Sequence, residues 1–202
     1  MKGLDLKTQF GIDYHNNSDS NYTPLTTRPM INQSSEGAAS ANNSNSLYWQ
    51  EETYLTYVKD INKHHINAMV GMSWQEYNYT KFEASDSKYI DDFYGYYNLG
   101  SGTNRPSVGS DYDKWAMNSY FLRGAYTYND RYMATVTARM DGSSKFGDNN
   151  KYAFFPSLGL GWLASNEGFM EDMTAIDQLK FHASYGVTGN SEIDPYKSLA
   201  TI

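Results

Sequence analysis

The sequence contains no cysteine, only five prolines and no long apolar run. Without cysteine there are no disulfides, no thiol catalysis and no cysteine-based zinc or iron–sulfur site. A membrane-spanning helix needs about 20 consecutive apolar residues, and nothing in the chain approaches that length, with a mean hydropathy of −0.69. The low average still allows transmembrane β-strands, because only alternate residues of such a strand meet lipid.

The chain is also short of positive charge, with a net charge of −7 over 202 residues. Nucleic-acid binding needs a basic face, so nucleic acid is not an expected partner. Residues 1–7 contain no apolar signal core. We therefore expect either a cytoplasmic protein or an internal piece of a larger exported protein, and the patterns below favour the second.

Aromatic side chains are abundant, with 19 tyrosines, 9 phenylalanines and 4 tryptophans. Many of them fall in segments that alternate apolar and polar residues with a period of two, as a β-strand with one apolar face does. Seven such segments predict strands: residues 4–15, 47–59, 65–78, 117–128, 131–141, 152–164 and 178–187. Most are longer than the strands of soluble proteins, which usually have about 5–6 residues.

The predicted strands have the length and the two faces of a membrane wall. About ten residues at about 3.3 Å each, tilted by about 40°, rise about 25 Å, the height of the lipid-facing band of a transmembrane barrel. In 131–141 one face carries Tyr132, Ala134, Val136, Ala138 and Met140. We therefore predict an all-β antiparallel meander of about seven long strands, part of a large transmembrane β-barrel.

Four basic side chains fall on the polar faces of these strands: Arg123, Arg139, Lys180 and His182. They are candidates for a lumen wall that meets substrate or a plug. A solvated strand face that only needs charge is the simpler explanation, because lumen faces are polar by default.

The first four connections alternate in length: residues 16–46, 60–64, 79–116 and 129–130. Long and short connections in turn predict loops on one side of a membrane and turns on the other. The last two connections, 142–151 and 165–177, do not follow this alternation. Ser165 is a candidate cap for a short helix that ends at Met173.

The connection 79–116 carries an aromatic cluster. We predict a substrate-stacking surface for a sugar or a peptide, because exposed aromatic rings on loops often bind ligands. An aromatic loop that packs on itself or on a partner lid is an equal alternative. The candidate residues are Tyr89, Phe93, Tyr94, Tyr96, Tyr97 and Trp115.

Signals for catalysis, metals and cofactors are missing from the sequence. His64 and His65 are adjacent, so on a strand they point to opposite faces and cannot chelate one metal ion. The aspartates do not have the spacing of a calcium loop. No phosphate-binding glycine loop or Gly-x-Ser-x-Gly elbow occurs. We therefore expect no enzyme activity, no cofactor and no metal.

Several motifs occur in the order and spacing of one known family. They are Asn129-Asp130-Arg131-Tyr132, Asp141-Gly142-Ser143-Ser144-Lys145-Phe146-Gly147, Phe155-Pro156-Ser157, Gly161-Trp162, Leu179-Lys180 and Ala183-Ser184-Tyr185-Gly186-Val187-Thr188-Gly189-Asn190, with a weaker match around Tyr54 and His64. With these motifs, about two-thirds of the chain resembles the barrel of a SusC/RagA-type TonB-dependent outer-membrane transporter.

This resemblance implies a larger parent protein with a signal peptide, a segment that contacts TonB, a plug domain and a barrel of about 22 strands. Residues 1–202 are then expected to form a partial barrel domain without signal peptide, plug or C-terminal strand. The implied location is the bacterial outer membrane. The implied function is import of oligosaccharide or peptide nutrients, with outer-membrane lipid, the TonB complex and a SusD-like surface lipoprotein lid as partners.

Two alternatives to an importer stay open at this point. The first is a soluble β-sandwich that binds carbohydrate through its tyrosine-rich loops, although a sandwich buries its apolar face against a second sheet and usually has shorter strands. The second is a porin-like barrel without TonB coupling, against which only the resemblance argues.

Overall fold

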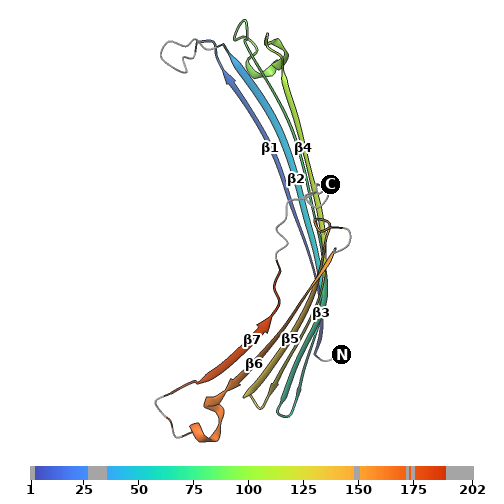
Figure 1. Ribbon diagram of the computed structural model, residues 1–202, viewed down its shortest axis with the longest axis vertical. Helices are drawn as coiled ribbons and strands as arrows, with labels where there is room; N and C mark the ends of the chain where they lie inside the picture. Colours follow the sequence, from blue (N-terminus) through green and yellow to red (C-terminus); the bar gives the residue numbers. More distant parts are fainter. Residues whose placement is uncertain (1–2, 27–35, 148–150, 172, 174–175, 190–202) are drawn as a thin grey trace. The chain divides into compact units, whose positions relative to one another are not determined.

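The computed structural model describes residues 3–26, 36–147, 151–171, 173 and 176–189, and these form one seven-stranded sheet. The strands are β1 (Leu4–Thr23), β2 (Ala38–Ile61), β3 (His64–Ser87), β4 (Ser107–Tyr128), β5 (Tyr132–Ser143), β6 (Tyr152–Leu163) and β7 (Lys180–Gly186). Each strand pairs with the next one along the chain (Figure 1). The predicted all-β antiparallel meander of seven strands is therefore confirmed.

The first four strands are longer than predicted. β1 continues through residue 23, and β2 and β3 have 24 residues each. About half of the residues assigned to the long connections 16–46 and 79–116 are therefore strand: 16–23, 38–46, 79–87 and 107–116. The prediction failed there because both faces of these extensions carry mostly polar or small residues, so hydrophobicity does not alternate although the backbone is still extended.

The two short turns are confirmed at 62–63 and 129–131. Asn129 and Asp130 have φ of 52° and 51°, the left-handed conformation that both central residues of a type I′ hairpin turn require. The backbone N–H of Arg131 closes this turn on the carbonyl of Tyr128 at 3.0 Å. Asn and Asp tolerate this conformation better than other residues with a side chain, so the local sequence fixes the turn.

Helical structure within the described residues is limited to single 3₁₀ turns. They are η1 (Gly95–Tyr97), η2 (Leu99–Ser101), η3 (Ala164–Asn166) and η4 (Gly168–Met170). The helix expected from Ser165 is wrong: Ser165 lies inside η3, and Glu167 separates η3 from η4 with an extended backbone. No helix in this part of the chain has the length and apolarity to span a membrane.

The chain divides into two compact units. Unit 1 comprises residues 1–11, 49–76 and 115–202, and unit 2 comprises residues 12–48 and 77–114. Buried apolar side chains are few among the described residues: Ala39, Tyr89, Ala164 and Met170. The described residues of neither unit therefore form the packed interior of a soluble domain.

Candidate functional site

The sheet of unit 1 has a continuous apolar face. Strand register aligns Val136 of β5 with Gly124 of β4 and with Leu158 of β6. Leu158 in turn lies opposite Tyr185 of β7. Cross-strand partners share a face of the sheet, so the apolar residues of successive strands form one band.

This band is exposed. Val136 is 51% exposed and Leu160 is 56% exposed. A β-sandwich would bury such a face against a second sheet, and the described residues form a single sheet. A long meander with one apolar and one polar face is the wall of a membrane β-barrel, in which lipid covers the apolar side chains.

The opposite face of the same strands carries polar side chains that bond to one another. The Arg139 guanidinium donates to Asp141 Oδ1 through Nε at 2.6 Å and to Ser119 Oγ through Nη2 at 3.1 Å. The hydroxyls of Thr137 and Ser157 are hydrogen-bonded across β5 and β6. This face therefore presents a hydrogen-bonded surface that suits water.

The structure places the four predicted lumen residues on this polar face. Arg123 pairs with Thr137 of β5, two residues from Arg139. His182 pairs with Gly161, and Lys180 pairs with Leu163. All four residues are exposed. Their role toward a substrate or plug stays a prediction.

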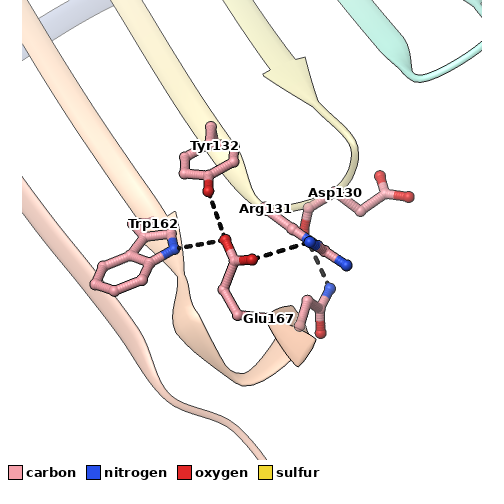
Figure 2. Close-up of polar contacts among 6 residues, drawn as sticks. Asp130, Arg131, Tyr132, Trp162 and Glu167 are labelled. Carbon is pink, nitrogen blue, oxygen red and sulfur yellow. Dashed lines mark hydrogen bonds and ion pairs between the residues drawn. The ribbon is translucent and has the colours of Figure 1, made fainter. Parts of the chain in front are cut away.

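A polar cluster at the turn end of these strands was not predicted from the sequence. Figure 2 shows the Glu167 carboxylate, in the connection between β6 and β7, receiving bonds from two neighbouring strands and a turn. Oε2 accepts from Arg131 Nη1 at 2.9 Å. Oε1 accepts from the Tyr132 hydroxyl at 2.6 Å and from the Trp162 indole N–H at 3.2 Å. We call these four residues the Glu167 anchor.

The Glu167 anchor is an electrostatic as well as a geometric link. Hydrogen bonds from Tyr132, then from Trp162, and the nearby Arg131 charge lower the pKa of Glu167 below its ordinary value. Its side chain is only 14% exposed. Next to it, the Asn166 amide donates to the backbone carbonyl of Asp130 at 3.1 Å. Asn166 and Glu167 are therefore both bonded to residues of the β4–β5 turn.

The aromatic loop of unit 2 divides into buried and exposed rings. Tyr89 is only 6% exposed, and its hydroxyl donates to the carbonyl of Leu99 at 3.2 Å. Its ring packs edge-on against Tyr22, so Tyr89 is covered within the loop, and its predicted contact with a substrate stays a prediction. Phe93 and Tyr97 are each 82% exposed.

The other predicted loop aromatics are also placed. Tyr94 is exposed and packs edge-on against Phe93. Tyr96 donates its hydroxyl hydrogen to the Tyr97 hydroxyl at 2.9 Å. Trp115 belongs to β4 in unit 1, where the Lys145 ammonium lies 4.9 Å from the centre of its ring. Their contact with a substrate stays a prediction.

Asp92 ties this loop to the end of β1. Its carboxylate accepts from the Tyr22 hydroxyl and from the backbone N–H of Leu25, the latter at 3.0 Å. Both hydrogen bonds lower the pKa of Asp92, and the bond from Tyr22 has the larger effect.

In the described part of the chain, no three His, Asp or Glu side chains gather as a metal site.

Comparison with known proteins agrees with the barrel-wall geometry. Residues 2–196 match the family described as "TonB dependent receptor-like, beta-barrel". The TonB-dependent receptor P26 of Formosa agariphila is 34% identical over 195 residues, which are 96% of this chain and 20% of that protein. The TonB-dependent receptor SusC of Bacteroides thetaiotaomicron is 31% identical over 146 residues, which are 69% of this chain and 14% of that protein.

Solved structures are similar over nearly the whole chain. The structure of the RagAB peptide importer in the 'open-open' state has a TM-score of 0.86 and 28% identity, over 97% of this chain and 21% of that chain. The structure of the RagAB peptide transporter has a TM-score of 0.83 and 26% identity, over 96% and 22%. The chain belongs to the β-barrel family of TonB-dependent receptors, which are bacterial outer-membrane proteins. It spans about a fifth of the length of the curated relatives it matches.

Proposed function

We propose that this chain is a section of the barrel wall of a TonB-dependent importer that takes up oligosaccharide or peptide nutrients. The observation that carries the proposal is the two-faced sheet of unit 1 in a chain of this family. The similar structures include a peptide importer, which supports a peptide nutrient, and the oligosaccharide alternative rests on the resemblance to SusC-type transporters.

The chain acts in this proposal as part of a longer receptor. Its coverage of about a fifth of its relatives supports that assignment. A plug domain and the contact with TonB are then contributed by other parts of the receptor. A surface lipoprotein lid of the SusD type is the proposed outer partner.

Each part of the chain has a role in this scheme. The apolar band meets lipid, and Arg123, Arg139, Lys180 and His182 line the aqueous lumen. The exposed loop rings contact the nutrient or the lid: Phe93, Tyr94, Tyr96 and Tyr97, with Trp115 on β4. Tyr89 positions the loop from inside. Transport makes or breaks no bond in the nutrient, so these residues bind and guide and do not catalyse.

Uptake measurements in the bacterium that carries the receptor test the proposal. Labelled oligosaccharides and peptides are supplied to cells with the receptor gene intact or deleted, with and without a protonophore. Receptor-dependent uptake that stops with the protonophore supports TonB-coupled import. Receptor-dependent uptake that continues without the proton gradient contradicts it and indicates a porin.

The loop rings are tested in the same cells by replacing Phe93 and Tyr97 with alanine. Aromatic contacts contribute about 0.5–1.5 kcal/mol each, so loss of two, about 1–3 kcal/mol, is expected to raise the apparent uptake Kd by about fivefold to 150-fold. Ile90→Ala is the matched control, because Ile90 is 80% exposed in the same loop and has no ring. Equal nutrient affinity of the double variant and the control would show that these two rings do not contribute to nutrient binding.

A further inference from the structure

A hollow of about 470 Å³ opens on the apolar face of unit 1, at the loop end of β5 and β6. Its walls include the indole rings of Trp49 and Trp74, the Tyr152 ring and the side chains of Asn118, Glu76 and Ser144. Binding pockets for small molecules usually measure about 300–1,000 Å³ and combine apolar walls with a few polar groups. This hollow has both features.

Strand alternation places the hollow on the side that faces lipid. Trp74 shares its face with Met72 and Val70, and Tyr152 shares its face with Phe154, all of them exposed. Asn118 lies opposite Gly142, and Gly142 lies opposite Tyr152, so these three residues form one row on the same face.

The hollow lies at the outer limit of the lipid band. The opposite end of β5 begins at Tyr132, next to the short β4–β5 turn and the Glu167 anchor, and short turns mark the periplasmic side of such barrels. From Tyr132 to Gly142 is ten steps along β5, which at about 3.3 Å each and a tilt of about 40° rise about 25 Å. Gly142 therefore reaches the outer headgroup level when Tyr132 lies at the inner one.

The floor of the hollow depends on a missing side chain. A Cβ on Gly142 would lie 2.5 Å from Asn118 Oδ1 and 2.5 Å from Tyr152 Cε1. The Asn118 amide donates to the Tyr152 hydroxyl at 3.3 Å above this glycine. The Tyr152 ring is thus held above Gly142, and it lines the hollow together with Trp49 and Trp74.

We propose that this hollow binds the sugar headgroup of a glycolipid in the outer leaflet. Flat aromatic faces pack against the C–H faces of a sugar ring, while amide, hydroxyl and carboxylate groups accept or donate hydrogen bonds to its hydroxyls. The acyl chains of the same molecule continue down the apolar band past Tyr120, Met140 and Phe154. This inference rests on the membrane placement of the sheet and is independent of which nutrient the receptor carries.

Aromatic residues at a membrane boundary usually form a belt that contacts headgroups of many kinds. The hollow differs from a belt because it has a defined volume and polar groups that converge on it. Preferential retention of one lipid class therefore distinguishes a specific lipid-binding site from a general aromatic belt.

Native mass spectrometry of the complete receptor tests the proposal. The receptor is reconstituted in nanodiscs of phosphatidylcholine mixed with monogalactosyl diacylglycerol and then released, and the bound lipids are counted. We expect preferential retention of the galactolipid. Trp74→Ala is expected to reduce this retention about tenfold, the effect of losing about 1.4 kcal/mol of aromatic contact. Equal retention of phosphatidylcholine and galactolipid would overturn a sugar site.

Three further variants separate binding from folding. Gly142→Ala is expected to lower retention without removing any polar or aromatic group, because its Cβ displaces the Tyr152 ring. Asn118→Leu keeps a side chain of similar size and is expected to lower retention as well. Leu160→Ala is the control, because Leu160 is exposed on the same face of β6, lies eight residues beyond Tyr152 toward the inner leaflet, and does not line the hollow.

The outcomes of this comparison decide the proposal. Retention by the Trp74, Gly142 and Asn118 variants equal to that of the Leu160 control would refute the site. Free methyl galactoside is the final arm: competition at concentrations comparable to those of the lipid would assign the hollow to soluble sugar and would overturn a glycolipid site.

Discussion

At the scale of single residues, Glu167 shows how one carboxylate connects parts of the chain that are distant in sequence. Its donors come from residues 131, 132 and 162. No local spacing rule joins these positions, so sequence reading did not find the cluster. The only signal was that aromatic rings with polar atoms, Tyr132 and Trp162, fall at strand ends, where a ring at a membrane boundary needs a partner for its polar atom.

Replacing Glu167 by Gln is expected to lower the stability of the receptor in a pH-dependent way. The pKa of Glu167 is lowered in the folded state, so its charged form stabilises folding above the unfolded value of about 4.3. That stabilisation is lost as pH falls through the folded-state pKa. Denaturant midpoints of the receptor in lipid vesicles should therefore differ most between wild type and variant near neutral pH and converge in acid.

Glu171→Gln is the matched control for this comparison. Glu171 is an exposed glutamate in the same connection, and its replacement changes net charge by the same amount. A gap between wild type and Glu167→Gln that stays constant with pH, or that also appears with Glu171→Gln, would show that the anchor charge is not responsible.

At the scale of elements, the ends of a strand were predictable only where its two faces differ in polarity. In β5 to β7 the predicted ends lie within two residues of the observed ones, since Val136, Leu158 and their neighbours alternate with polar residues. In β1 to β4 the alternation of apolar and polar residues ends well before the strands end, because hydrophobicity has no period of two along a strand with two polar faces. The β4–β5 turn was predictable from Asn129-Asp130, whose local chemistry needs no tertiary contact.

The two faces of β5 are expected to respond differently to charge. Val136→Lys places an ammonium in the lipid band and is expected to cost about 2–4 kcal/mol near the bilayer midplane. Thr137→Lys places the same group on the polar face, with only the hydrogen bond to Ser157, about 1 kcal/mol, to lose. Urea midpoints of the receptor in vesicles measure both. Equal destabilisation by the two variants would contradict the assignment of the faces.

The β4–β5 turn provides a paired test of backbone conformation. Asn129→Ala is expected to destabilise the receptor by about 1 kcal/mol, because alanine adopts a positive φ at a cost of about 1–2 kcal/mol and Asn129 has a φ of 52°. Asn129→Gly removes the same side chain at no such cost. If glycine is as harmful as alanine, the asparagine side chain and not the turn geometry is what matters.

At the scale of the whole molecule, the membrane wall was predictable and the surfaces that act on ligands were not. Alternation, strand length and family motifs were sufficient for the barrel, because lipid imposes one simple pattern on every strand. The loop rings have no such pattern. Tyr89 and Tyr97 look alike in the sequence, yet one is buried against Tyr22 and the other is exposed, since loop folding decides which ring is covered.

The 202-residue chain by itself is expected to aggregate during refolding into lipid vesicles. In the described sheet β1 and β7 are edge strands, and unpaired backbone groups at a sheet edge are not tolerated in hydrocarbon. Size-exclusion chromatography after detergent extraction should give mostly large species, whereas the complete receptor gives a discrete one. A discrete monomer of the isolated chain with protease-resistant strands would contradict this expectation.

The Glu167 anchor also depends on the register in which β5 pairs with β6. Tyr132 and Trp162 are directly opposite one another, and both rings reach the same carboxylate oxygen. A register shift of one residue between β5 and β6 would turn one ring to the other face of the sheet. Glu167 would then lose one hydrogen-bond donor, and the Arg131 guanidinium would no longer lie next to the Glu167 carboxylate. Hairpins paired in the wrong register would therefore carry an unsatisfied Glu167 carboxylate at the membrane edge. This charge destabilises the wrong register before the barrel closes.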